Sequence, residues 1–176
     1  KNGHSADVVL GYDRLEDYRT GNTSYQGATV GRYANRIAGG KAEIDGTLYS
    51  LSQNENGNTL HGGFQGFHQK AWRLKGSNND DEAPSITFAY RSADGEEGFP
   101  GNLDVSICYT LTTDNALVID YTAKTDVSTL VNLTNHSFFN LTGDPARDIL
   151  SHELQIHADF VTAAGEGLIP TGELVP

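Results

Sequence analysis

Two histidines stand in segments whose composition suits proton transfer. His61 lies in NTLHGG, and the two glycines that follow it can let the backbone approach a ligand closely. His136 lies in VNLTNHSFFNL, between an asparagine and a serine and directly before two phenylalanines. Imidazole exchanges protons near neutral pH, so either ring could act as an acid or a base. A glycine turn with an incidental histidine, and a satisfied core histidine, remain the structural alternatives.

A third polar segment, GRYANRIAGGK, contains the neighbouring pair Asn35 and Arg36 in a glycine-bounded turn. The guanidinium of Arg36 offers a rigid fork of donors that suits oxygen ligands. The alternative is a structural arginine that ties loops together. The glycine spacing matches neither the phosphate-binding P-loop nor the dinucleotide-binding fingerprint.

Other chemistries find little support in the spacing of the reactive residues. His61 and His68 lack a tight metal-ligand spacing, and His152 and His157 lie five residues apart in a strand-like run, hence on opposite faces. No G-x-S-x-G motif is present. Cys108 is the one cysteine, so it forms no internal disulfide, and its apolar surroundings predict a buried structural thiol. These spacings therefore predict no metal site.

The bulk composition narrows the possible partners. The 176 residues carry a formal net charge of −11, which repels phosphate backbones and anionic lipid. No apolar run approaches the ~18 residues that a membrane-spanning helix needs. We expect no nucleic acid and no membrane as partner, whereas a neutral small molecule is indifferent to this charge.

Short runs of alternating apolar and polar residues must position these side chains. Asp45–Gly46 predicts a hairpin within residues 41–52, and Thr113 to Asn115 predicts a turn within 103–125. A short helix or single turn is expected at Arg14–Tyr18. The remaining strand-like runs are 7–12, 71–77, 85–92, 128–141 and 152–163. Regular short spacing between turns predicts an all-β, antiparallel β-sandwich.

The whole chain, residues 1–176, is predicted to form a single domain. Strand-like DVVLGY near the start has no preceding partner, and IPTGELVP at the end has no closing strand. A sandwich cut at these points would expose unpaired sheet edges. We therefore expect a domain truncated at both ends.

Five segments taken together resemble the aldose 1-epimerase (galactose mutarotase) family. They are GATVGRYANRIAGGKAEIDG, NTLHGG, DGEEGFPGNL, NLTNHSFFNL and IPTGELVP, in the family's order. The resemblance spans roughly residues 7 to 176. It implies the galactose mutarotase-like supersandwich, an antiparallel fold about twice as long as this chain.

The resemblance also implies an activity, the interconversion of α and β anomers of hexoses such as galactose or glucose. A base takes the C1 hydroxyl proton while an acid protonates the ring oxygen, and the opened ring recloses as the other anomer. By resemblance His136 is the general acid, and His61 contacts the sugar near the ring oxygen and assists catalysis. Arg36 with Asn35 binds the sugar. No cofactor or metal is implied.

The family's general base is a glutamate that the resemblance places beyond Pro176. Glu166 and Glu173 lie in a different motif, and the expected partner for catalysis is the remaining C-terminal part of the same protein. A general base must come within ~3 Å of the proton that it removes. We therefore expect sugar binding by this chain with little turnover.

Two other functions are weighed against this one. A non-catalytic carbohydrate-binding module of the same fold would lack the base. A relative acting on phosphorylated hexoses would need additional basic residues near the site, and the net charge of −11 disfavours it. The expected compartment is the cytoplasm, or a periplasm if a leader was removed.

Overall fold

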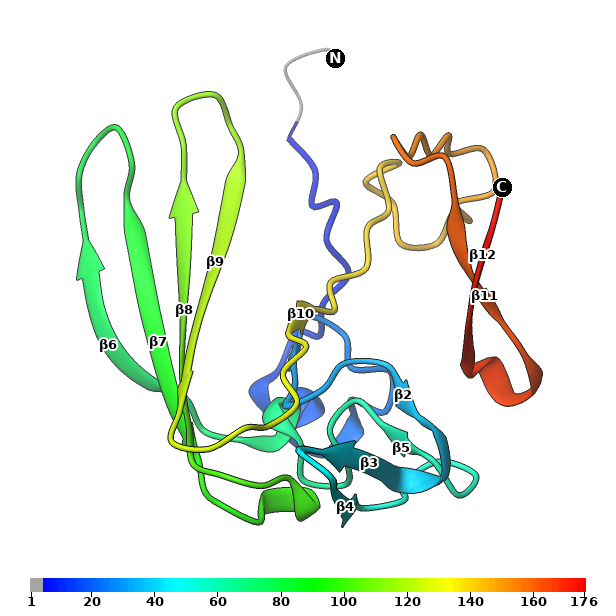
Figure 1. Ribbon diagram of the computed structural model, residues 1–176. Coiled ribbons are helices and arrows are strands. Elements are labelled where there is room, and N and C mark those ends of the chain that lie inside the picture. The colour runs from blue at the N-terminus through cyan, green and yellow to red at the C-terminus, as the bar shows by residue number, and fades with distance from the viewer. Residues whose placement is uncertain (1–4) are drawn as a thin grey trace. The chain divides into compact units, whose positions relative to one another are not determined.

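Four consecutive strands form the main sheet of the computed structural model, which describes residues 5–176. The strands are β6 (Arg73–Asn78), β7 (Ser85–Ser92), β8 (Leu103–Leu111) and β9 (Leu117–Thr125). They lie side by side in chain order, each antiparallel to the next (Figure 1). The strands and turn predicted between residues 71 and 125 are thereby confirmed.

The two faces of this sheet differ because side chains alternate along each strand. On β8, Leu103, Val105 and Ile107 are buried, whereas Asp104 on the opposite face is exposed. Together with Phe67 these three form a hydrophobic core. Partly buried residues packed against it are Trp72, Tyr90, Tyr109, Ile119, Tyr121 and Leu133.

Cys108 departs from its prediction. It is a free thiol but only half-buried, because its even position on β8 places it on the polar face of the sheet, opposite Asp120. The apolar neighbours that suggested burial alternate with it along the strand and face the core instead.

Short antiparallel pairs make up the rest of the strand structure. The predicted hairpin consists of β3 (Lys41–Ile44) and β4 (Thr47–Ser50), and Asp45 and Gly46 turn with φ of 50° and 76°. The other pairs are β1 (Thr29–Val30) with β10 (Thr134–Asn135), β2 (Arg36–Ile37) with β5 (Thr59–Leu60), and β11 (Val161–Ala164) with β12 (Pro170–Val175). The all-β, antiparallel fold class is confirmed.

Among residues 5–176, helical structure is confined to short turns. They are η1 (Asp17–Gly21), a π-helical turn, and the 3₁₀ turns η2 (Ala38–Gly40), η3 (Phe67–Gln69), η4 (Glu96–Gly98) and η5 (Glu166–Leu168). The short helix predicted at Arg14–Tyr18 lies at this place but extends further along the chain. Within the described residues, no helix is long and apolar enough to cross a membrane.

Three segments predicted as strands are mostly irregular. Residues 7–12 contribute one bridge, from Val9 to Phe139; 128–141 contains only β10 as a strand, and 152–163 becomes extended only at Val161. Side chains of this region bind the backbone locally. Asn140, for instance, donates to two nearby carbonyls and accepts from Thr142. Such local bonds offer the backbone an alternative to the strand ladder.

Contacts divide the chain into two compact units, each described by itself. One contains the described part of Lys1–Val30 with Thr134–Pro176, and the other is Gly31–Leu133. The single domain over 1–176 stays a prediction, and residues 1–4 lie outside the described residues.

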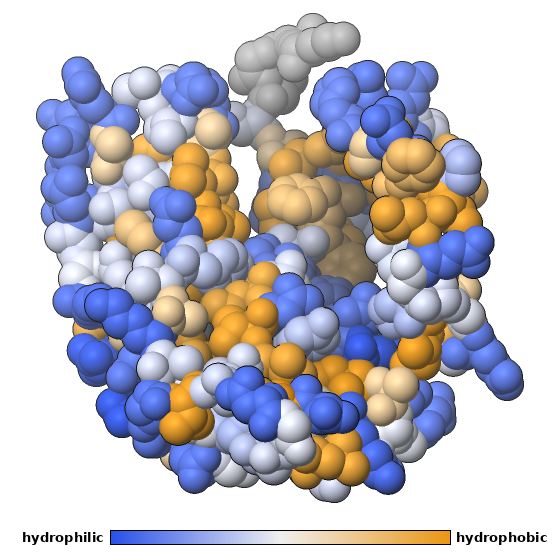
Figure 2. Space-filling model, in the orientation of Figure 1, coloured by the Kyte–Doolittle hydropathy of each residue, from blue (hydrophilic) through white to orange (hydrophobic). Residues whose placement is uncertain are grey.

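In the first unit, large apolar side chains lie exposed around β11 and β12 (Figure 2). They are Ile149, Leu150, Leu154, Ile156, Phe160, Val161, Leu168 and Leu174.

Candidate functional site

Asn35 and His61 hold each other by two hydrogen bonds. The backbone N–H of Asn35 donates to Nδ1 of His61 at 3.0 Å, and the backbone N–H of His61 donates to the carbonyl of Asn35 at 3.1 Å. Because Nδ1 accepts, the proton of the neutral ring resides on Nε2. His61 is therefore held in the tautomer whose Nε2–H is a donor.

The backbone at both residues is left-handed. Asn35 has a φ of 67° and His61 a φ of 53°. Asparagine and histidine tolerate this region better than most residues, yet it remains uncommon outside glycine. Left-handed residues that persist in a structure often cluster at functional sites.

A two-residue strand pair places these residues beside one another. Arg36 of β2 pairs with Leu60 of β5, so Asn35 and His61 lie at the adjoining ends. The amide side chain of Asn54 extends this short ladder. Its Oδ1 accepts from Leu60 N–H at 2.7 Å, and its Nδ2 donates to the Leu60 carbonyl at 2.9 Å. The Asn54 side chain thus supplies the hydrogen bonds that a longer partner strand would supply to β5.

The Glu55 carboxylate accepts two hydrogen bonds from the Arg36 guanidinium. Its Nε donates to Oε2 at 3.2 Å and its NH2 group to Oε1 at 2.9 Å. This bond raises the pKa of Arg36 and lowers the pKa of the Glu55 carboxyl. NH1 of the same guanidinium donates to Oδ1 of Asn35 at 3.4 Å. The pairing therefore fixes the plane of the Arg36 fork and turns NH1 toward the Asn35–His61 pair.

A tight turn positions Glu55. Glu55 and Asn58 exchange two backbone hydrogen bonds, of 3.1 and 2.8 Å, around Asn56 and Gly57. These two central residues have φ of 48° and 81°, as a two-residue hairpin turn of the primed type requires. The ENGN sequence therefore builds the partner of Arg36.

The loop that follows His61 is held by another carboxylate. Glu97 accepts from the backbone N–H groups of Phe64 and Gln65 at 3.0 and 2.9 Å. Gly63 lies against this carboxylate with a φ of 99°, and a Cβ there would collide with it. The second glycine of NTLHGG therefore serves close approach to Glu97, within the protein.

Glu97 in turn belongs to a loop anchored by the buried Arg32. The Arg32 guanidinium donates to the carbonyls of Ser92, Ala93, Pro100 and Gly101 and to the hydroxyl of Ser92. Arg32 is 2% exposed and lies over the ring of Phe99, 5.6 Å from its centroid. Burial lowers the pKa of Arg32, while Glu96 and Asp94 act to raise it.

His136 belongs to the first unit, where backbone and rings frame it. Its N–H donates to the carbonyl of Ala28 at 2.9 Å, and its carbonyl accepts from Gly27 at 3.1 Å. The rings of Tyr25 and Phe138 lie 5.8 and 5.1 Å from the imidazole, centroid to centroid. One of the two phenylalanines that follow His136 in the sequence therefore also lies beside its ring.

The structure therefore brings together three of the four predicted site residues, Asn35, Arg36 and His61, within the second unit. The sequence interpretation missed Glu55, Glu97 and Arg32, which hold them. The turn signal at ENGN, with its one glutamate, and the segment DGEEGFPGNL were the available hints, since both place carboxylates in turns. Among residues 5–176, no group of three His, Cys, Asp or Glu side chains is arranged to hold a metal ion.

Comparison with known proteins decides the family. The family model described as aldose 1-epimerase matches residues 1–176. The chain belongs to the aldose 1-epimerase family. A galactose mutarotase of Pongo abelii is 46% identical over 176 residues, 100% of this chain and 49% of that protein. An aldose 1-epimerase of Escherichia coli is 40% identical over 168 residues, 96% of this chain and 47% of that protein.

A solved structure of another aldose 1-epimerase homologue shows the same fold. The crystal structure of a GalM/aldose epimerase homologue from C. elegans superposes with a TM-score of 0.89 at 32% identity. The match covers 99% of this chain and 51% of that one. This aldose 1-epimerase family chain thus spans about half the length of the curated relatives it matches.

Proposed function

We propose that this chain forms the sugar-handling part of an aldose 1-epimerase that interconverts the α and β anomers of an aldohexose such as galactose or glucose. Asn35 and Arg36 bind the sugar, His61 contacts it near the ring oxygen and assists catalysis, and His136 is the general acid. Family membership and the geometry around His61 support this proposal. The neutral sugar also suits a chain with a net charge of −11.

The observation that carries the proposal is the reciprocal Asn35–His61 pair. A ring whose Nδ1 accepts a backbone hydrogen bond offers Nε2–H as a donor without having to be charged. A sugar ring oxygen is an acceptor, and it gains negative charge as the C1–O5 bond breaks. A donor fixed in advance toward such an oxygen stabilises the charge without reorganisation during the reaction.

In this proposal Arg36 binds sugar hydroxyl groups and His136 donates a proton. Glu55 occupies Nε–H and one N–H of the NH2 group, so the remaining N–H groups of Arg36 are the donors for sugar hydroxyl oxygens. As the acid, His136 would deliver its proton to the ring oxygen while a base removes the proton from the C1 hydroxyl. General acid and general base each contribute typically ~10²–10⁴-fold.

Polarimetry of freshly dissolved α-galactose tests the proposal, on this chain and on any longer polypeptide that contains it. We expect the longer polypeptide to speed mutarotation, with His61→Ala and His136→Ala each lowering the rate by about 100-fold or more. His157→Ala, an exposed histidine of the first unit, is the matched control and should retain the parental rate. A folded longer polypeptide with no rate above buffer would refute the enzymatic function.

Sugar binding by the 176-residue chain is the second readout. We expect galactose to shift the NMR signals of Asn35, Arg36 and His61, with little turnover by the chain alone. Binding without catalysis in every longer polypeptide would instead identify a carbohydrate-binding module. Full activity of the chain alone would place the base within residues 1–176.

A further inference from the structure

The polar face of the main sheet contains a groove with a floor of small side chains. The strand register aligns Ala89 of β7, Ser106 of β8 and Thr122 of β9 in one row across the sheet. Neighbouring strands lie about 4.8 Å apart, so this row is about 10 Å long. Two of the three residues carry hydroxyl groups, which can donate to a ligand.

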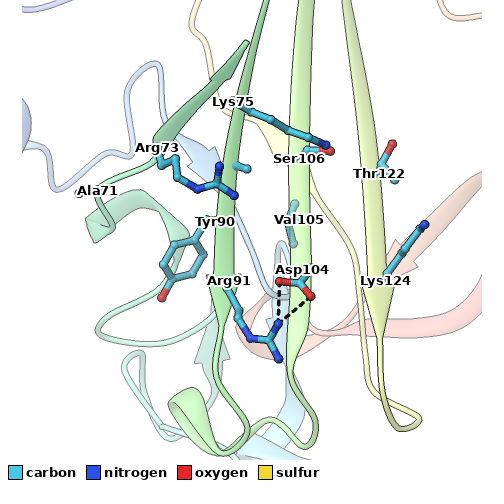
Figure 3. Close-up of a pocket in the computed structure, with 11 residues that line it drawn as sticks. Ala71, Arg73, Lys75, Tyr90, Arg91, Asp104, Val105, Ser106, Thr122 and Lys124 are labelled. Carbon is cyan, nitrogen blue, oxygen red and sulfur yellow. Dashed lines mark hydrogen bonds and ion pairs between the residues drawn. The ribbon is translucent and has the colours of Figure 1, made fainter.

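Long basic side chains surround this floor. Arg73 of β6 extends the row, since it pairs with Ala89. Lys75 follows at the irregularity where the β6–β7 register shifts, between Leu74 and Gly76. Lys124 of β9 stands one row further along the sheet. Figure 3 shows Arg73 and Lys75 reaching from β6 across the groove, with Lys124 on its other side.

The groove has a volume of about 500 Å³, within the range of small-molecule sites. Its lining contains one carboxylate, Asp104, which is paired at 3.0 Å with the fourth basic residue, Arg91 (Figure 3). The other three cations, Arg73, Lys75 and Lys124, form no ion pair with any residue from 5 to 176.

The groove gathers three cations without an ion pair among the described residues, in a chain that is acidic overall. Lysine and arginine total 12 against 23 acidic residues, so acidic partners are plentiful. Three like charges around one groove repel one another, and an anion placed between them would relieve that repulsion. The next row toward the hairpin ends holds Cys108 and Asp120, so the positive surface is limited to one small ligand.

We propose that this groove binds the phosphate group of a small phosphorylated molecule. Arg73, Lys75 and Lys124 would supply charge-assisted hydrogen bonds, and Ser106 and Thr122 would supply neutral donors from the floor. A phosphate has enough oxygen atoms to accept from several directions at once, whereas a carboxylate has two. The groove shares no lining residue with the Asn35–Arg36–His61 site, so this proposal is independent of the proposed function.

The test is a titration of the ¹⁵N-labelled 176-residue chain with sodium phosphate and with pyrophosphate, at constant ionic strength. We expect saturable shifts at Ala89, Ser106 and Thr122, with pyrophosphate binding more tightly than phosphate because it carries more charge. Chloride at matched ionic strength should leave these signals in place. The same titration with phosphatidic acid vesicles separates a lipid headgroup from a free small molecule, and we expect no tighter binding to the vesicles.

Charge-removing variants then decide whether the groove is responsible. Lys75→Gln with Lys124→Gln should weaken pyrophosphate binding by about tenfold, roughly threefold for each exposed charge. Lys41→Gln is the matched control, since Lys41 is exposed in the same unit and has no ion pair among the described residues. The absence of saturable binding by the parent, or an equal loss in the control, would overturn the proposal.

Discussion

Replacing Arg32 by methionine should destabilise the second unit strongly. Methionine has a similar length and packs well in apolar surroundings, but it cannot donate hydrogen bonds. Four backbone carbonyls, at Ser92, Ala93, Pro100 and Gly101, would lose the donor that they now share. Water cannot easily replace the guanidinium, because Arg32 is only 2% exposed.

The expected cost follows from these bonds. A buried acceptor left without its partner costs at least ~1 kcal/mol. The Ala93 carbonyl keeps the backbone N–H of Glu96 as a donor, so the other three carbonyls amount to about 3 kcal/mol. One term opposes this cost. Nε of Arg32 has no acceptor among the described residues, and methionine removes that buried donor. We therefore expect a loss of about 2–3 kcal/mol, a large share of the 5–15 kcal/mol typical of a domain.

Urea unfolding followed by tryptophan fluorescence measures this loss. Trp72 is the one tryptophan of the chain, and it packs in the same unit against Phe67 and Tyr90. Arg91→Met is the control, because its ion pair with Asp104 is exposed and should change stability by less than about 0.5 kcal/mol. If Arg32→Met came within 1 kcal/mol of the parent, the view of Arg32 as a loop anchor would be wrong.

Three further predictions concern the residues around the candidate site. Gly62→Ala should lower the free energy of unfolding in urea by at least about 2 kcal/mol, because φ is 85° and a Cβ would collide with a backbone carbonyl. Gly76 lies in open space, so Gly76→Ala should cost less than about 1 kcal/mol. Glu97→Ala should speed hydrogen exchange of the two amides that it binds, and unchanged protection would contradict the clamp. The Arg36–Glu55 pair should persist as pH falls through the ordinary glutamate range near ~4.3 and be lost only below it, because the pKa of Glu55 is lowered in the folded state. The Nε–H NMR signal of Arg36 reports this loss, and its disappearance above pH ~4.3 would contradict the assigned direction.

The long strands could be predicted from sequence because their physical signal is local. Alternation along Leu103–Leu111 distinguishes the core face from the polar face, and the Asp45–Gly46 dipeptide is suited to the turn that it forms. The strand predicted over residues 128–141 was mostly wrong. Asparagine and serine side chains there can bind the nearby backbone, and these local bonds compete with strand pairing. Asn135, for example, accepts from the backbone of Ser137, and the strand ends there.

Sequence reasoning identified the candidate ligand-binding residues but not the residues that hold them in place. His61 and Arg36 stood out because their side chains suit proton transfer and oxygen binding. Glu55 lies 19 residues from Arg36, and Glu97 lies 33 from the amide of Phe64 that it binds. No local pattern predicts such pairings, because they depend on how loops fold back on one another.

Carboxylates of this acidic chain also accept hydrogen bonds that fix side chains and loops, a role that residue counts alone do not reveal. Glu55 binds a side chain, Glu97 binds two backbone amides, and Asp126 accepts from both the backbone and the amide group of Asn102, which lowers its pKa. The strands β2 and β5 that flank the site are two residues long, too short to orient a side chain through their ladder alone. Orientation at this site therefore comes from charged acceptors placed in turns. The carboxylates of Glu55 and Glu97 thus fix Arg36 and the loop after His61, so we expect their removal to disturb the candidate site without touching its imidazole.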